Sequence, residues 1–432
     1  MLSSKCCTQC SKAELDLFTV PPTNISMECG AMVEHLPLSK PEDGPLEFDI
    51  SSPDEYVDLG RMFLYIKAKI VKGDDDLAAD DKVGPVNLWL HSLFSQVDVQ
   101  LNGKLVTPSV NTYPYKAYLE TLLSYGSDAK ESQLTSQLWY LDEDPIDDIE
   151  PFKAEGANPG LKDRGLHIKE SKSVEMMGRL HCDIFQQDRY LLNKTDLHLK
   201  LVRSPQDFHL MKDATAVKTV IEDAVLYVRK VKISPSILNE HNQLLNGGHL
   251  AKYPIRRSVV TTYTIPQGTM SANKDNIIMG QLPRRIVLGL VSNKAFNGQA
   301  NENPFNFQHF NLNYLALHVG GQQVPQKPLT PNFGSDLYMR SYMTLFEGTG
   351  MLNADRGQSI DRDDFKNGYA LYAFDLTPDM AEGAHTDPIK YGNVRVDIHF
   401  SAELPKTVNV IVYAEYDNLI QIDRARTVIT DY

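Results

Sequence analysis

The sequence contains no apolar stretch long enough to cross a membrane as a helix. No run approaches the roughly 18 consecutive apolar residues that such a helix needs, and residues 1–7 lack the apolar core of a secretory signal. We therefore expect no transmembrane segment. Cysteine is scarce, with five residues in a chain of 432. An odd number of cysteines without a secretory signal favours a reducing compartment and predicts no disulfide framework.

The common signatures of catalysis and cofactor binding are also missing. The sequence has no glycine-rich phosphate loop, no His-Glu-x-x-His and no Gly-x-Ser-x-Gly. Cys6, Cys7 and Cys10 could bind zinc together with Cys29, but Cys29 has no cysteine near it in the sequence. The adjacent pair at 181–182 is more typical of a packed strand than of a nucleophile. We therefore expect no metal site, no cofactor and no enzymatic activity.

Positive charge is in the minority. The chain has 43 Lys and Arg against 56 Asp and Glu, for a net charge of −13. A surface of this sign repels the phosphate backbone, which argues against coating nucleic acid with the whole surface. Acidic clusters at 74–81, 142–150 and 361–364 lack the turn glycines of a calcium loop, so we expect solvated loops there.

Strand patterns dominate the rest of the chain, and helices are few. Strict alternation of apolar and polar residues marks 46–50, 97–101 and 197–201, and the second of these runs into the hairpin turn Asn102-Gly103. Helical spacing of apolar residues appears over 115–123. A second helix is expected from Ser234-Pro235, with a stripe formed by Ile237, His241, Leu244 and Leu245. This balance predicts an all-β sandwich or barrel.

The two halves of the chain repeat the same order of elements. A hairpin over 97–106 precedes an apolar helical stretch over 118–126, and a hairpin over 315–324 precedes a similar stretch over 342–348. A strand that begins with an arginine precedes each hairpin. The last strand of each half is apolar and contains a tyrosine, Tyr227 or Tyr413. Such a repeat predicts two copies of one domain of about 200 residues.

The predicted fold is therefore all-β, with two tandem eight-stranded jelly rolls and a few short helices in loops and at the junction. The expected divisions are an N-terminal arm over 1–30, a first jelly roll over 31–236, a connecting helix over 237–249 and a second jelly roll over 250–432. We expect the helix stripe at 237–245 to pack between the two domains and to fix their relative tilt.

The sequence resembles the double jelly-roll major capsid proteins of Polinton/Maverick-type elements and adintovirus-like viruses over most of residues 35–425. The stretches that carry the resemblance are Asp54–Leu59, Val86–Val97, Asn111–Tyr115, Ser234–Leu238, Leu371–Asp379 and the last strand through Tyr413. The resemblance implies a hexon-like homotrimer that forms pseudo-hexagonal capsomers of an icosahedral shell. It implies neighbouring capsomers and vertex (penton) and minor capsid proteins as partners, and a place in the virion after assembly in the host cytoplasm or nucleus.

Two further expectations follow for such a shell. The long polar connection over 142–172 would lie in an outer crown, away from nucleic acid. The basic pairs Arg256-Arg257 and Arg284-Arg285 would lie at lower walls or the base. There they would contact acidic neighbouring subunits, which we favour, or the phosphates of packaged DNA without reading its sequence.

Two alternatives remain. A bicupin-like or lectin-like β protein with metal-dependent enzymatic or sugar-binding activity needs clustered histidines with a carboxylate. The candidates His91, His181, His198, His309 and His318 are scattered singly along the sequence. A minor capsid or vertex protein is usually a single jelly roll, and the doubled length argues against it.

Overall fold

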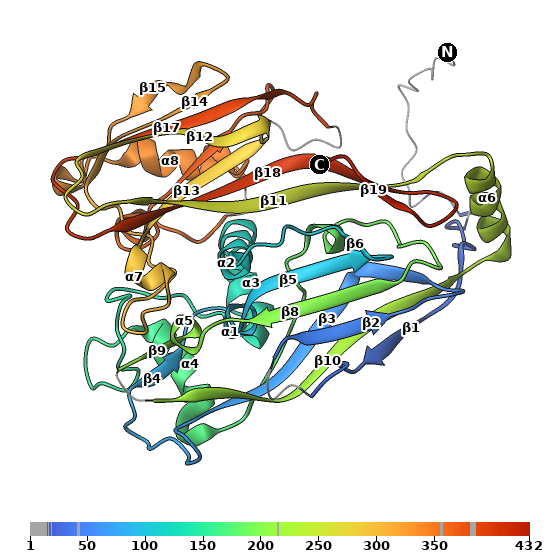
Figure 1. Ribbon diagram of the computed structural model, residues 1–432, viewed down its shortest axis with the longest axis horizontal. Coiled ribbons are helices and arrows are strands. Elements are labelled where there is room, and N and C mark those ends of the chain that lie inside the picture. Colours follow the sequence, from blue (N-terminus) through green and yellow to red (C-terminus); the bar gives the residue numbers. More distant parts are fainter. Residues whose placement is uncertain are drawn as a thin grey trace.

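The computed structural model describes Leu15 and residues 17–18, 20–40, 44–213, 216–354, 357–380 and 386–432. The described strands divide into a first half and a second half, which lie against each other with the helix of residues 113–124 between them (Figure 1). Cys6, Cys7 and Cys10 lie outside the described residues. Cys29 is exposed and Cys182 is buried, and neither is in a disulfide.

The first half consists mainly of two four-stranded antiparallel sheets. One contains, from edge to edge, β1 (Met27–His35), β10 (Lys218–Ile233), β3 (Tyr56–Val71) and β7 (Val174–Gly178). The other contains β2 (Leu46–Ile50), β8 (Leu197–Arg203), β5 (Phe94–Leu101) and β6 (Lys104–Leu105). A short pair, β4 (Val83–Pro85) and β9 (Leu210–Lys212), forms a separate ladder.

The second half repeats this arrangement. One sheet contains β11 (Ala251–Ile265), β18 (Val408–Ile422), β13 (Arg285–Ser292) and β16 (Leu371–Asp375), with β19 (Val428–Thr430) also paired to β18. The other contains β12 (Ser271–Gln281), β17 (Tyr391–Phe400), β14 (Leu312–Val319) and β15 (Gln322–Leu329). When the short strands β4, β9 and β19 are left out, each half contains eight strands among the described residues. Numbered along the chain, these eight strands occupy the same positions in the two sheets of both halves. The predicted fold class, two tandem eight-stranded jelly rolls, is confirmed.

The paired hairpins of the repeat are also confirmed, and their turns explain the residues found there. Asn102 and Gly103 have φ angles of 47° and 77°, and Gly320 and Gly321 have φ angles of 55° and 85°. Two successive positive φ values define the two-residue turn whose twist matches that of the flanking strands, and Asn and Gly adopt them at the lowest steric cost.

The helices lie in the connections between strands. After each hairpin comes one of the predicted helices, α2 (Tyr113–Ser124) in the first half and α8 (Met339–Gly348) in the second. The other α-helices of the described residues are α1 (Trp89–Ser92), α3 (Ser127–Lys130), α4 (Pro159–Ile168), α5 (Gln206–His209), α6 (Pro235–Asn246), α7 (Asn293–Phe296) and α9 (Arg362–Lys366). Across the part of the chain that the structure describes, no helix has both the length and the apolar character needed to span a bilayer.

One boundary expected from sequence differs from the structure. Strand β1 begins at Met27, and Cys29 pairs with Lys232 of β10, so the end of the expected 1–30 arm belongs to a sheet. Every residue of β1 is exposed or half-buried. The alternation of a half-buried strand is therefore absent there, which explains why the sequence pattern did not reveal it.

The connecting helix α6 also differs from expectation. It lies at one end of the molecule, outside the space between the two halves (Figure 1). Of the predicted stripe, Leu245 is only 6% exposed, but Leu244 is 47% exposed and Ile237 and His241 are half-buried. His241 places Nδ1 3.0 Å from the Tyr56 hydroxyl. The stripe faces a hollow at this end, and the packing between the halves that we expected of it is made by α2.

Candidate functional site

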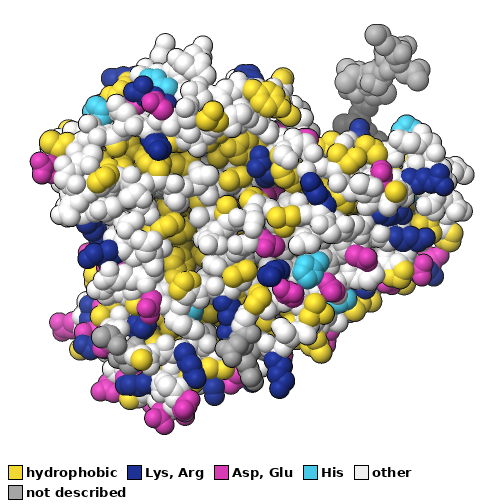
Figure 2. Space-filling view, in the orientation of Figure 1, with side chains coloured by type: hydrophobic (Ala, Val, Ile, Leu, Met, Phe, Trp, Pro, Cys, Tyr) yellow, Lys and Arg dark blue, Asp and Glu magenta, His cyan; other side chains and the backbone are white. Residues whose placement is uncertain are grey.

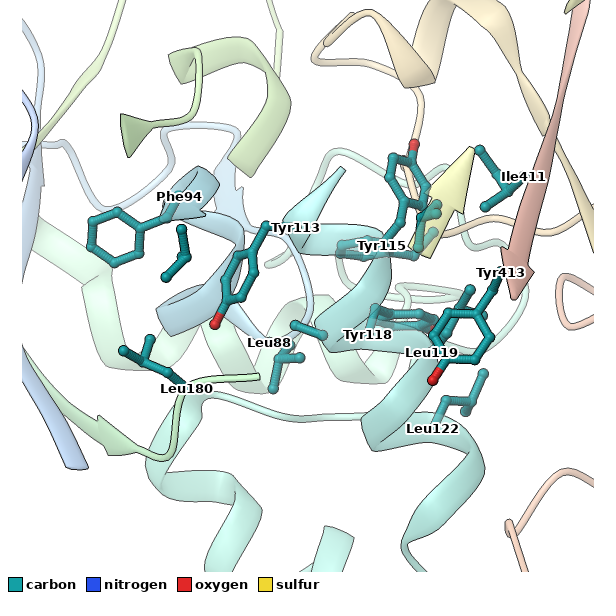
Figure 3. Close-up of a cluster of buried hydrophobic side chains, with 14 of the residues drawn as sticks. Leu88, Phe94, Tyr113, Tyr115, Tyr118, Leu119, Leu122, Leu180, Ile411 and Tyr413 are labelled. Carbon is teal, nitrogen blue, oxygen red and sulfur yellow. The ribbon is translucent and has the colours of Figure 1, made fainter. Parts of the chain in front are cut away.

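Helix α2 is the element that joins the two jelly rolls. All of its residues except Ser124 are buried, including charged ones. Tyr118 stacks on Phe305 of the second half, with ring centroids 4.1 Å apart and planes 3° apart, and Tyr115 stacks on Phe296 at 5.5 Å. Figure 3 shows Tyr115, Tyr118 and Leu119 of this helix beside Ile411 and Tyr413 of β18. The buried apolar residues of the two halves therefore form one continuous core.

The charges on α2 are paired. Lys116 forms an ion pair with Asp183, and Asp183 Oδ1 also accepts a hydrogen bond of 3.2 Å from the backbone N–H of Ser258 in β11. Glu120 Oε2 lies 2.7 Å from Nδ1 of His181. Burial alone would lower the pKa of Lys116, but Asp183 and Glu120 raise it above its ordinary value. The lysine therefore stays charged, and its partner must stay in place to compensate it.

The acidic segment 142–150 forms a second connection between the halves. Asp142 is buried, and its Oδ1 accepts a hydrogen bond of 2.6 Å from Nη2 of Arg164, a fully buried arginine in α4. Its Oδ2 accepts from Nδ2 of Asn303 in the second half at 3.0 Å. The Tyr369 hydroxyl donates to the backbone oxygen of Asp142 at 2.7 Å. This carboxylate links elements from both halves.

A neighbouring carboxylate extends the connection. Asp147 accepts from the backbone N–H of Asn303 at 2.8 Å and from Nδ2 of Asn306 at 3.0 Å. Burial raises the pKa of Asp147 above its ordinary value. The prediction that 142–150 is a solvated outer loop is therefore wrong for Asp142 and Asp147. Asparagines distant in sequence supply hydrogen-bond donors to both carboxylates, of which Asp142 is buried and Asp147 is half-buried.

The cluster at 74–81 agrees with the expected solvated loop, but the cluster at 361–364 does not. Asp74, Asp75, Asp76 and Asp80 are exposed. In the cluster at 361–364, Asp361 accepts hydrogen bonds from the backbone N–H groups of Asp363 and Asp364, both at 2.8 Å, and so caps the N-terminus of α9. This cluster therefore starts a helix on the surface.

The four candidate arginines fall into two groups. Arg284 and Arg285 are buried, and both have partners within the chain. Arg284 lies 3.5 Å from Asp417, and Arg285 donates to the backbone oxygen of Gly348 at 2.6 Å and pairs with Glu415 at 3.3 Å. The expectation that this pair meets neighbouring subunits or phosphate is corrected, because both guanidinium groups lie inside the chain.

The other pair lies closer to the surface. Arg257 is half-buried between the rings of Tyr416 and Tyr432, at 4.6 and 4.7 Å from their centroids, and donates to Asn418 at 2.9 Å. Arg256 is exposed. On the face shown in Figure 2, Lys and Arg side chains are scattered among Asp and Glu instead of forming one basic patch. Arg256 therefore remains the most accessible of the four for an intermolecular contact.

The candidate histidines occupy separate environments. His91 is buried, with its ring nitrogens 2.9 Å from the Tyr113 hydroxyl and 2.8 Å from Gln137. His198 lies 2.6 Å from Asp49, His318 lies 3.1 Å from Asp397, and His309 stacks on Phe333. Of the five candidate histidines, His91 and His181 approach each other, with ring centroids 4.7 Å apart. Among the described residues, no group of three or more His, Cys, Asp or Glu side chains could hold a metal ion.

Two buried histidines predict an acid-sensitive fold. Burial lowers the pKa of His209 from 6.5 to about 4 and holds the pKa of His91 well below 6.5. Below pH 6.5 the unfolded chain binds protons that the folded chain does not bind. The stabilisation is therefore complete above pH 6.5 and is lost as the pH falls towards 4, by up to about 1.4 kcal/mol per pH unit for each histidine.

Urea unfolding at pH 7 and pH 5 measures this loss. In the variant His209→Gln, the unfolding free energy should depend less steeply on pH. The difference in slope should be about 1.4 kcal/mol per pH unit, which corresponds to one proton. An identical slope in the variant and the parent would contradict the assignment to His209.

Comparison with curated proteins gives a relative of similar length. No protein-family model matches the chain. It is 27% identical over 406 residues to F54H12.2, an uncharacterized protein of Caenorhabditis elegans, and the alignment covers 90% of this chain and 94% of that protein.

Solved viral structures are similar over nearly the whole chain. A chain of the Sputnik virophage matches with a TM-score of 0.63 and 12% identity, covering 98% of this chain and 92% of that one. The faustovirus major capsid protein matches with a TM-score of 0.58 and 9% identity, covering 93% of this chain and 92% of that one. The mavirus major capsid protein matches with a TM-score of 0.52 and 13% identity, covering 100% of this chain and 95% of that one. The chain therefore has the double jelly-roll fold of these major capsid proteins.

Proposed function

We propose that this chain is a major capsid protein with a structural, non-enzymatic role. Three copies would form a hexon-like, pseudo-hexagonal capsomer of an icosahedral shell. The observation that carries the proposal is the repeat of one eight-stranded jelly roll with the same strand order in both halves. Three such chains present six similar wedges around one axis, which is the outline that tiles a shell.

The junction supports the same role. A shell subunit must hold its two wedges at a fixed angle while neighbours press on both. The aromatic stack of α2 and the Asp142–Arg164 pair with Asn303 join the halves through groups that are buried and hydrogen-bonded. Such an interior resists deformation, because close-packed cores transmit strain instead of absorbing it.

We further propose an origin in a Polinton/Maverick-type element or an adintovirus-like virus. The resemblance of stretches such as Val86–Val97 and Leu371–Asp379 supports this origin, as does a relative of nearly equal length in an animal, Caenorhabditis elegans. The partners would be neighbouring capsomers, vertex (penton) and minor capsid proteins, with at most sequence-nonspecific contact with packaged DNA. The chain would reside in the virion after assembly in the host cytoplasm or nucleus.

Assembly should respond to salt. With a net charge of −13 per chain, facing capsomers repel each other unless ions screen them. We expect raising the ionic strength from about 0.05 M to about 0.5 M, which shortens the Debye length roughly threefold, to promote assembly of purified capsomers. Light scattering and negative-stain electron microscopy measure the yield of closed shells.

A decrease in assembly as the salt concentration rises would show that attractive ion pairs between capsomers dominate. The variant Arg256→Glu then separates the two explanations, because Arg256 is exposed. It should leave assembly in high salt unchanged if repulsion is the main barrier. Variants of Arg284 and Arg285 do not serve this purpose, since both side chains are buried inside the chain.

A further inference from the structure

The end of the molecule that carries α6 contains an apolar hollow. The hollow has a volume of about 470 Å³. Its apolar lining comes from α6, from the residues just before and after this helix, and from the first half. These lining residues are Leu192, Ile233, Ile237, Leu244, Leu245 and Leu250. Arg189, His249 and Lys252 also line it and are exposed, so its rim is basic.

The segment before β1 has the complementary composition. Residues 14–20, which we call the docking segment, read Glu-Leu-Asp-Leu-Phe-Thr-Val in the sequence. Of its described side chains, Leu17 is 75% exposed and Phe18 is 95% exposed, and Leu15 and Val20 are also exposed. Several exposed large apolar side chains in one short segment mark an interaction site. The two acidic residues of the segment match the basic rim of the hollow.

The described side chains of the docking segment do not occupy the hollow of their own molecule, since they are exposed and are not among the residues that line it. Ser26 and Met27 line that hollow, so the arm starts at its rim. Asn24 Oδ1 accepts a hydrogen bond of 3.0 Å from the backbone N–H of Ser26, which fixes the exit of the chain. Pro21 and Pro22 follow in the direction of the N-terminus, and consecutive prolines favour a stiff, extended path of about 3.1 Å per residue.

We propose that the docking segment of one copy occupies the α6 hollow of a second copy. The apolar side chains of Leu15–Val20 would enter the hollow, and the acidic residues at 14 and 16 would face Arg189 and Lys252. The inference goes beyond the proposed shell, because exchange of arms can be present or absent in a trimer that performs any function. The proposal gives Leu244, the exposed residue of the α6 stripe, a role in contact between chains.

Disulfide trapping between co-expressed chains tests the exchange. Cys6, Cys7, Cys10 and Cys29 are replaced by Ser, and the buried Cys182 remains. One chain carries a tag and Leu17→Cys, and the other carries Leu244→Cys. In the control experiment, the second chain carries Leu337→Cys in place of Leu244→Cys. Leu337 lies in the second half and is more exposed than Leu244, at 69% against 47%, so its lower yield cannot be explained by poorer access. Non-reducing electrophoresis after mild oxidation measures the covalent heterodimer.

We expect at least about tenfold more heterodimer with Leu244→Cys than with Leu337→Cys. Adding Lys252→Glu to the Leu244→Cys chain should reduce the yield severalfold. A yield no higher than the control overturns the proposal. A single chain that carries both Leu17→Cys and Leu244→Cys provides a second test. If the disulfide forms only within this chain and never between two chains, the proposal is also overturned. Light scattering on the same samples reports the trimer separately, so failure of arm exchange and failure of the proposed capsomer give different results.

Discussion

Replacing Asp142 by Ala lowers the free energy of unfolding by about 3–5 kcal/mol. The Asp142 carboxylate compensates Arg164, whose side chain is fully buried, and it also accepts a hydrogen bond from Asn303 of the other half. Without the carboxylate, a buried guanidinium charge has lost its counter-ion and a buried amide has lost its acceptor. Urea unfolding followed by fluorescence and circular dichroism measures the loss.

The matched control is an ion pair of the same segment that lies in solvent. Glu150 pairs with Lys82, and both side chains are partly exposed. The change Glu150→Gln should cost less than about 1 kcal/mol, because solvent screens such a pair. The double variant Asp142→Asn, Arg164→Met should recover part of the loss, since it removes both charges. Equal costs for Asp142→Ala and Glu150→Gln would contradict the role of Asp142 at the junction.

Replacing Tyr118 by Ala has a comparable effect through packing. Tyr118 is buried on α2 and stacks on Phe305. Removing the ring leaves a cavity between the two halves, and truncation of a buried aromatic side chain costs about 3–5 kcal/mol. Differential scanning calorimetry should show a lower melting temperature, and limited proteolysis should show faster cleavage between the halves.

Tyr391 provides the control for this change. It is exposed on β17, and Tyr391→Ala should alter stability by no more than about 0.5 kcal/mol. If Tyr118→Ala melts at the temperature of the parent, the aromatic stack of α2 does not hold the two halves together. The rigid junction on which the proposed function depends would then need another explanation.

The fold could be predicted from the sequence because its signals are local. The turn residues Asn102-Gly103 and Gly320-Gly321 specify their hairpins within a few residues, and a helix follows each. The order of these elements could be compared between the halves without knowing any contact distant in sequence. Strand β1 was not found, because its exposed faces leave no alternating pattern.

The junction could not be predicted, because its partners are distant in sequence. Asp142 belongs to a run of acidic residues that is typical of a solvated loop, and its donor Asn303 lies in the other half. Arg284 and Arg285 have the composition of a surface patch, but Asp417 and Glu415 on β18 neutralise them inside the chain. One signal was available for α2: tyrosines and leucines around its whole circumference are typical of a helix that is buried on all sides.

The mass of the purified full-length chain in solution tests the central claim most directly. The claim is that two jelly rolls locked into one rigid unit associate as three copies. Size-exclusion chromatography with multi-angle light scattering should give about three times 48.6 kDa, and that mass should persist on dilution. A stable species of 48.6 kDa at every concentration would contradict the claim that the chain builds capsomers.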